Sequence, residues 1–169
     1  MTTTTGNIAN LHSTLNTLPE RTRAQVAGLL NRRLADAIDL QIQCKQAHWN
    51  VKGPQFIALH KLFDEIHEDV AGYVDLIAER IVQLGGVAEG AVRTVAGRTE
   101  LDEYPLALSN GTDHVKKLSA ALAAFASRMS TAIKETDKLE DVGTADLCTE
   151  ILRGTDKWLW FVEAHLQSR

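Results

Sequence analysis

Two pairs of candidate metal ligands lie in the segment 56–84. His60 and Asp64 are four residues apart, and so are Asp75 and Glu79. Residues at this spacing lie one turn apart on the same face of an α-helix, close enough to share a metal ion. The pattern indicates a metal-binding helix, although charged side chains on a long amphipathic helix more often form its solvated face.

The two pairs are too far apart to hold one metal on a single helix. Asp64 and Asp75 are separated by eleven residues, which is roughly 16 Å along a helix, whereas a metal needs its ligands at about 2 Å. His60 and Glu79 are equally distant in sequence from the midpoint 69–70, and so are Asp64 and Asp75. A second, antiparallel copy of the helix, related by a two-fold axis at this midpoint, would bring each ligand to its counterpart and form two equivalent sites.

Apolar residues at helical spacing predict four long helices in an all-α chain. A long crossover at 87–110 carries a short helix near its start, and the other two connections are short. Such connections give a four-helix bundle with one crossover, a ferritin-like topology. Periodicity alone leaves a cytokine, a cytochrome or a structural adaptor open as alternatives. The expected helices span 19–49, 56–84, 112–136 and 144–166, the last with Thr144 as its N-cap.

The candidate ligands point away from the core of their own bundle. The apolar face of the segment 56–84 lies roughly 130° from the ligand face, at about 100° per residue. A metal site inside a bundle uses Glu-x-x-His pairs on core faces, and no such pair occurs in the sequence. Ala71 lies on the ligand face near the midpoint 69–70, where its small side chain would let two helices approach.

Length and composition fit one globular domain. The chain has 169 residues and a net charge of −4, and we expect a partly disordered N-terminal tail at 1–18 followed by a bundle domain at 19–167. Two cysteines are too few for a disulfide scaffold, which favours the reducing cytoplasm. The N-terminus does not have the pattern of a secretory signal, and no apolar run is long enough to predict a membrane span.

Several segments resemble the Dps family, the mini-ferritins named for DNA protection during starvation. The resemblance is carried most strongly by a His-Trp-Asn motif and by the two ligand segments that follow it, and it covers the chain from about Leu11 to Leu166. The matching segments are 47–53, 56–64, 75–86, 104–106 and 157–163.

The resemblance implies an iron-oxidising enzyme, a ferroxidase, that also stores iron. Iron would bind at a mono- or dinuclear site between subunits of a hollow dodecamer built from two-fold dimers. Fe²⁺ would be oxidised, with hydrogen peroxide preferred over dioxygen, and ferric oxide would be stored inside. Consuming Fe²⁺ and peroxide together would prevent hydroxyl-radical formation during oxidative stress. Imidazoles and carboxylates suit iron, and the implied ligands are His48, His60, Asp64, Asp75 and Glu79.

The resemblance also suggests an iron entry route and a radical trap. Asp146 best matches the acidic residues that line three-fold pores in the family, with Asp141 and Glu140 as further candidates, but Gly143 stands where some members have another acid. The alternative for Asp146 is an acidic helix start favoured by the helix dipole. Trp49, beside His48, is a candidate radical trap, with packing in the core as its alternative.

The main alternative function is a nucleoid protein that compacts DNA and has secondary iron chemistry. DNA-binding members commonly carry a lysine-rich tail, but residues 1–20 contain no lysine or arginine. An acidic chain has no general attraction for phosphates, so we expect weak or absent DNA binding. A basic cluster on the first helix is the one feature that would favour DNA, and it consists of Arg21, Arg23, Arg32 and Arg33. A metal-free structural bundle is a third alternative, but it leaves the ligand spacing unexplained.

Overall fold

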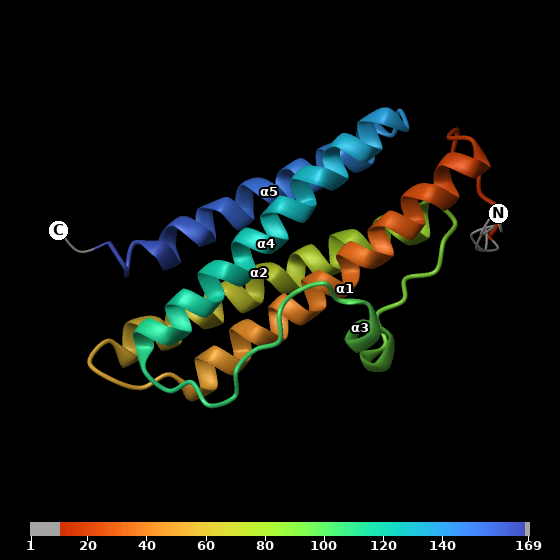
Figure 1. Cartoon of the computed structure of the whole chain (residues 1–169). Helices are drawn as coiled ribbons and strands as arrows, with labels where there is room; N and C mark the ends of the chain where they lie inside the picture. The colour runs from red at the N-terminus through yellow and green to blue at the C-terminus, as the bar shows by residue number, and fades with distance from the viewer. Residues whose placement is uncertain (1–10, 168–169) are drawn as a thin grey trace, which may run out of the picture.

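The computed structural model describes residues 11–167, and it confirms the all-α fold. Four long helices pack side by side, and a long crossover with one short helix returns the chain along the bundle between the second and third of them (Figure 1). The bounds differ from the expected ones by no more than about three residues at either end of a long helix. The helices are α1 (Glu20–Asn50), α2 (Phe56–Gln83), α3 (Val92–Arg98), α4 (Gly111–Lys138) and α5 (Val142–Glu163).

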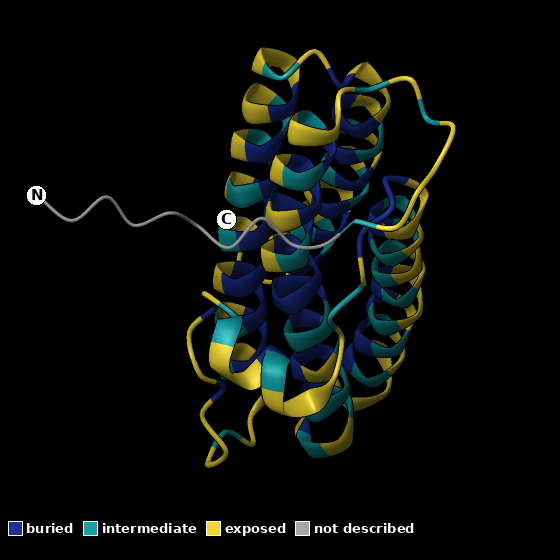
Figure 2. Cartoon of the chain, turned by 90° about the vertical axis from the view of Figure 1, so that its right-hand side faces the viewer, coloured by how far each residue is buried: buried dark blue, intermediate teal, exposed yellow. Residues whose placement is uncertain are grey.

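A single apolar core joins the four long helices. Each long helix turns an apolar face toward the core, so that buried and exposed residues alternate with the helical period (Figure 2). On α2 this face includes Phe63, Ile66 and Ile77, each of which is fully buried. The opposite face of α2 is therefore free to carry polar groups. Within residues 11–167, no helix is long and apolar enough to cross a membrane.

The end of α2 is fixed by a glycine and by the segment that precedes α1. Gly85 has a φ of +85°, a conformation that glycine adopts without steric cost. Its carbonyl accepts a hydrogen bond from the backbone N–H of His12 at 2.8 Å. A Cβ atom at Gly85 would lie 2.6 Å from the carbonyl oxygen of His12. The turn therefore needs glycine both for its backbone angles and for the close approach of the chain.

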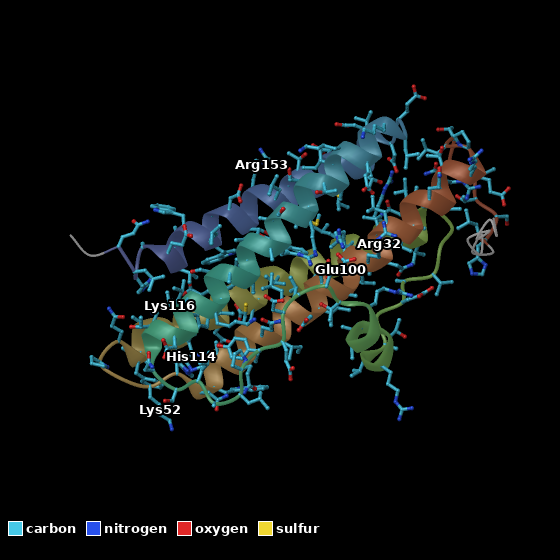
Figure 3. All side chains as sticks on the ribbon, in the orientation of Figure 1. Arg32, Lys52, Glu100, His114, Lys116 and Arg153 are labelled. Atoms are coloured by element: carbon cyan, nitrogen blue, oxygen red, sulfur yellow. The ribbon has the colours of Figure 1, made fainter. Side chains whose placement is uncertain are left out.

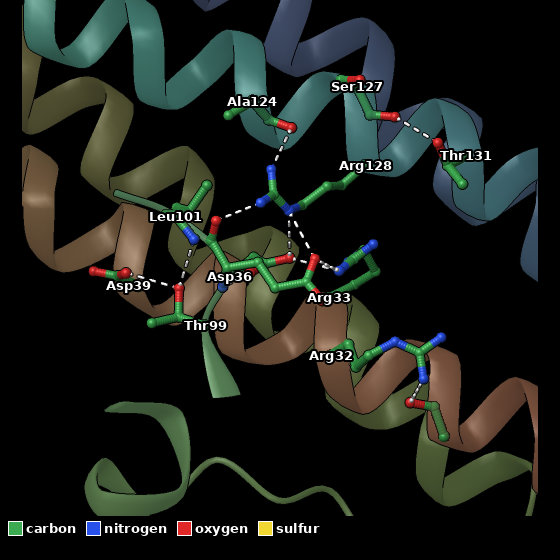
Figure 4. Close-up of polar contacts among 12 residues, drawn as sticks. Arg32, Arg33, Asp36, Asp39, Thr99, Leu101, Ala124, Ser127, Arg128 and Thr131 are labelled. Carbon is green, nitrogen blue, oxygen red and sulfur yellow. Dashed lines mark hydrogen bonds and ion pairs between the residues drawn. The ribbon is translucent and has the colours of Figure 1, made fainter. Parts of the chain in front are cut away.

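The crossover is held against the bundle by a cluster of charged groups, Arg33, Asp36, Glu100 and Arg128 (Figure 4). Asp36 is fully buried and accepts a hydrogen bond from the backbone N–H of Glu100 at 2.8 Å. Arg33 contacts both carboxylates, Asp36 at 2.9 Å and Glu100 at 3.1 Å. Burial raises the pKa of Asp36, whereas the hydrogen bond from Arg128 lowers the pKa of Glu100. The cluster fixes the part of the crossover that leads into α4.

The N-terminus of α5 is capped by Asp141, so the expectation that Thr144 is the N-cap is wrong. The Asp141 carboxylate accepts hydrogen bonds from the Thr144 backbone N–H at 3.0 Å and from its hydroxyl at 2.5 Å. Arg80 of α2 donates to the same carboxylate at 2.8 Å and to the Thr144 hydroxyl at 2.8 Å. The helix starts earlier than expected because a carboxylate three residues before Thr144 satisfies one of the free N–H groups of the first turn.

We predict that Asp141→Ala destabilises the protein by about 1–3 kcal/mol, because it removes a helix cap and leaves the partly buried Arg80 without its carboxylate partner. Urea unfolding at one fixed protein concentration measures the change. Asp146→Ala is the matched control: Asp146 lies on the same helix but is exposed, so its removal should cost less than about 0.5 kcal/mol. Equal unfolding midpoints for the two variants would contradict the role of Asp141.

Candidate functional site

Two histidines from different helices face each other near the α1–α2 turn. His48, on the last turn of α1, stacks on His60 of α2 with the ring centroids 3.7 Å apart. The Nδ1 atom of His48 lies 2.7 Å from the carbonyl oxygen of His60, and the Nδ1 atom of His60 lies 2.8 Å from the carbonyl oxygen of His48. Residue spacing does not predict this reciprocal bonding, because it requires the folded turn.

The reciprocal bonds decide which ring nitrogen of each histidine is free. A carbonyl oxygen only accepts hydrogen bonds, so each Nδ1 must carry a proton. In a neutral imidazole the Nε2 atom then keeps its lone pair, which is the form that binds metal. Bonds of this kind also fix the orientation of metal-binding histidines. His48 and His60 could therefore each hold a metal through Nε2 on one side of the turn.

Asp64 lies one turn beyond His60 and completes this half of the site. One of its carboxylate oxygens lies 3.8 Å from Nδ1 of His48, and the same oxygen forms an ion pair with the ammonium group of Lys45. The hydrogen bond from Lys45 is the main cause that lowers the pKa of Asp64, and the nearby His48 also lowers it. Asp64 is therefore a carboxylate at neutral pH, ready to bind a cation.

Lys45 is a site residue that the sequence analysis missed. It lies three residues before His48 on α1, which is the spacing of same-face neighbours on a helix. This spacing is the sequence feature from which Lys45 could have been identified. Its partner on α2 could not be identified from spacing, because the contact is between helices. A cation that binds Asp64 has to compete with the ammonium group of Lys45 for one oxygen.

Asp75 and Glu79 lie farther along the exposed face of α2, away from the histidines. Both are exposed, and within residues 11–167 no hydrogen bond or ion pair engages either side chain. Within the same residues, no three His, Cys, Asp or Glu side chains of one chain come together to hold a metal. One chain thus stacks His48 on His60 and places Asp64 near His48, without forming a complete metal site, and it leaves Asp75 and Glu79 farther along α2.

The exposed face of α2 also carries apolar and very small residues. Ile57 and Val82 are each 59% exposed, and they are equally distant in sequence from the midpoint 69–70. Gly72 is the counterpart of His67 about the same midpoint, and a Cβ atom at Gly72 would meet nothing within 4 Å. Packing inside the chain therefore does not require glycine at this position. The midpoint itself is anchored to α5, because the indole of Trp158 donates a hydrogen bond to Asp69 at 2.7 Å.

The predicted pore acids and the predicted radical trap lie in different environments. Asp146 is exposed on the first turns of α5, whereas the Asp141 side chain is 2% exposed and is engaged by Arg80 and Thr144. Asp141 thus has a structural role that leaves Asp146 as the exposed acid of the pair. Trp49 is 63% exposed, so the alternative that it packs in the core is wrong for the single chain.

The basic cluster on α1 is smaller than the sequence indicates. Arg23 is buried and donates to the carbonyl oxygen of Leu84 at 2.9 Å. Arg33 is buried in the charged cluster that holds the crossover. Only Arg21 and Arg32 of the four arginines are exposed, so the outer face of α1 offers two separate positive charges.

Comparisons with known proteins agree with this fold. The family model of the ferritin-like domain matches residues 27–169. A DNA protection during starvation protein of Agrobacterium fabrum is 44% identical over 94% of this chain and 98% of its own. One from Mycolicibacterium smegmatis is 33% identical over 92% of this chain and 84% of its own.

Solved structures give the same relationship. DpsA14 from Streptomyces coelicolor has a TM-score of 0.91 and 32% identity, over 96% of both chains. A Dps protein from Vibrio cholerae, described as a member of the ferritin-like diiron-carboxylate superfamily, has a TM-score of 0.86 over 96% of this chain and 99% of its own. Its identity of 23% shows a shared fold alone. From the matched domain, the sequence relatives and the bundle itself, we conclude that this chain belongs to the Dps family of ferritin-like proteins.

Proposed function

We propose that the protein is a ferroxidase that oxidises Fe²⁺ at a site shared by two copies of the chain and stores ferric oxide in a hollow dodecamer. Its membership of the Dps family already supports iron storage and protection under stress as its broad function. The observation that carries the proposal of a shared site is that the candidate ligands fall into two groups, which are separated along α2. His48, His60 and Asp64 form one half of a site, and the unengaged Asp75 and Glu79 lie about 16 Å along the same helix.

The exposed face of α2 supports a second copy of the chain as the group that completes the site. A two-fold axis at the midpoint 69–70 places Glu79 beside the other copy's His60, and it also places the exposed Ile57 beside the other copy's Val82. The axis places Gly72 opposite the bulkier His67. The same two-fold axis that brings the ligands together thus also pairs apolar side chains and lets the two helices approach closely. Such self-complementary pairing is what an isologous interface requires.

The ligand types fit the oxidation of iron, in which iron is the substrate. Oxygen and nitrogen ligands accommodate both Fe²⁺ and Fe³⁺, and a negative carboxylate stabilises the more highly charged product. Hydrogen peroxide accepts two electrons and two Fe²⁺ ions supply them, so no hydroxyl radical is released. We propose peroxide as the preferred oxidant over dioxygen. Stopped-flow oxidation with each oxidant tests this preference, and faster turnover with dioxygen would refute it.

Three further assignments belong to the proposal. Trp49 would trap a stray oxidising equivalent, since its exposed indole is next to His48, and loss of a tryptophanyl radical signal in Trp49→Phe would test this. Asp146 would attract Fe²⁺ at a pore of the shell. The protein would work in the cytoplasm, which cell fractionation tests.

Burial raises the pKa of both free thiols, Cys44 and Cys148, to about 12, so neither supplies a reactive thiolate there.

We expect assemblies of His60→Ala chains, and likewise of Glu79→Ala chains, to form shells that oxidise Fe²⁺ slowly. Co-assembly of the two variants should restore activity. A mixed dimer has one site with both substitutions and one intact site, so random mixing should recover roughly a quarter of the sites. Iron oxidation followed by absorbance, with size-exclusion chromatography to verify assembly, measures this.

The control for this experiment is co-assembly of His60→Ala with Asp64→Ala. Both substitutions remove ligands from the same half of the site, so every site in a mixed dimer lacks one of them. Activity should then stay at the level of the single variants. If the first mixture is no more active than its components, the site is not shared between chains.

We predict that Asp146→Asn slows mineral formation more at low ionic strength than at high. A carboxylate at a pore concentrates cations at the entrance, and dissolved salt screens this attraction. Glu150→Gln, which changes an exposed acid one turn farther along α5, is the control. Identical rates for Asp146→Asn and the unmodified protein at every salt concentration would exclude the pore role.

We predict that the protein does not retard plasmid DNA in gels at physiological salt and pH 7.5. Each chain contributes a net charge of −4, so a shell repels phosphates, and attraction by an isolated arginine reaches only about 8 Å at this salt. Robust retardation that disappears in an Arg21→Gln, Arg32→Gln double variant would favour the nucleoid function. Arg98→Gln, whose side chain pairs with Glu89, is the control substitution.

A further inference from the structure

A buried tyrosine–histidine pair lies inside the bundle, apart from the proposed iron ligands. Tyr104 of the crossover is 7% exposed, and His114 on the first turn of α4 is 1% exposed. The phenol oxygen lies 2.5 Å from Nδ1 of His114, and the two rings stack with their centroids 6.0 Å apart. Figure 3 shows His114 at the end of the bundle where α4 begins, near the α1–α2 turn.

The environment decides where the shared proton lies. Burial raises the pKa of Tyr104, so the phenol keeps its proton, and burial lowers the pKa of His114, so the imidazole is neutral. Tyr104 is therefore the donor and Nδ1 of His114 the acceptor. The backbone carbonyls of Asn50 and Leu108 act in the opposite direction on His114 and favour its charged form. Its buried Nε2 has no partner within hydrogen-bonding geometry among the described residues.

The pair lies close to α1 and α2 near the histidine half of the proposed iron site. The ring of Phe63 is 6.5 Å from that of His114, and Phe63 lies between His60 and Asp64 in the sequence of α2. The fully buried Cys44, near enough to raise the pKa of Tyr104, lies one turn before His48 on α1. Packed side chains thus connect the pair to both helices that carry the iron ligands.

We propose that Tyr104 is an internal one-electron donor to the iron site and that His114 accepts its proton. This inference rests on the proposed ferroxidase function. When a single Fe²⁺ reacts with hydrogen peroxide, iron supplies one of the two electrons needed and Tyr104 supplies the other. The products are Fe³⁺, two water molecules, a neutral tyrosyl radical and a protonated His114. The two protons needed for water come from solvent.

The hydrogen bond lowers the cost of this step in a buried place. Loss of an electron alone would leave a phenol cation without water, which carries a large desolvation cost. Transfer of the proton along the existing bond places the charge on an imidazolium instead. The carbonyls of Asn50 and Leu108 stabilise that charged form. The second oxidising equivalent of peroxide is thereby held inside the protein instead of leaving as a hydroxyl radical.

The chain offers a direct test because it has only two tyrosines, Tyr73 and Tyr104. Tyr73 lies on α2 with its hydroxyl against Gly154 of α5. In assembled Tyr73→Phe protein, every tyrosyl signal must come from Tyr104. We would mix this protein with less than one Fe²⁺ per site and excess hydrogen peroxide, freeze it within milliseconds and record electron paramagnetic resonance spectra. Ring-deuterated tyrosine, which narrows a tyrosyl spectrum, separates the signal from tryptophanyl radicals.

We expect a tyrosyl radical in Tyr73→Phe and its loss in Tyr104→Phe. His114→Gln should lose most of the signal because the phenol no longer has its proton acceptor. Spin-trapped hydroxyl radical should rise several-fold in Tyr104→Phe. Circular dichroism and size-exclusion chromatography verify that each variant is folded and assembled, and the Tyr73→Phe spectrum decides the question even if Tyr104→Phe does not fold.

Iron oxidation measured in parallel, with two Fe²⁺ per peroxide, separates the two proposals. If Tyr73→Phe oxidises iron but shows no tyrosyl signal, the electron-donor role of Tyr104 is refuted and the ferroxidase function stands. If a tyrosyl signal persists in Tyr104→Phe, the donor is a different residue. If the unmodified protein oxidises no iron, both proposals fail together.

Discussion

A straight helix cannot bring together ligands that lie three turns apart, and this constraint shapes the chemistry of the chain. The rigidity of α2 comes from its inner face, where Phe63, Ile66 and Ile77 are fully buried in the core. Its midpoint is tied to α5 by the hydrogen bond from Trp158 to Asp69. A helix so firmly held keeps its two groups of ligands at a fixed separation. The helix therefore favours a site assembled by association over one formed by bending.

The crossover is also held firmly against the bundle. It is held by the charged cluster around Asp36, in which a buried carboxylate is stabilised by Arg33 and by the backbone of Glu100. A buried charge is costly unless such partners are present. The same anchoring brings Tyr104 to His114. A segment that connects two helices thus also supplies a buried phenol at the end of the bundle that carries His48 and His60.

Features with regular spacing were predictable from sequence, because they depend on one helix at a time. The four long helices, the core face of α2 and the separation of Asp64 from Asp75 are of this kind. The resemblance to the Dps family named His48, and the structure places it against His60. The five ligands as a set remain a prediction, since the described residues of one chain form no complete metal site.

Contacts between elements could not be read from spacing. Lys45 reaches Asp64 across two helices, and Asp141 rather than Thr144 caps α5 because Arg80 of α2 favours a carboxylate there. Arg23 and Arg33 looked like part of an exposed basic cluster, yet their long side chains turn inward to carbonyl and carboxylate oxygens. Each of these outcomes depends on a partner distant in sequence.

The reciprocal bonds between His48 and His60 have a consequence for how the site tolerates change. Each ring is oriented by the main chain of the other residue, not by its side chain. Replacing one imidazole therefore leaves intact the carbonyl that orients its neighbour. The remaining ring loses its stacking partner but keeps its tautomer. The backbone path of the α1–α2 turn thus sets the orientation of the two imidazole rings, and side-chain substitution does not change it.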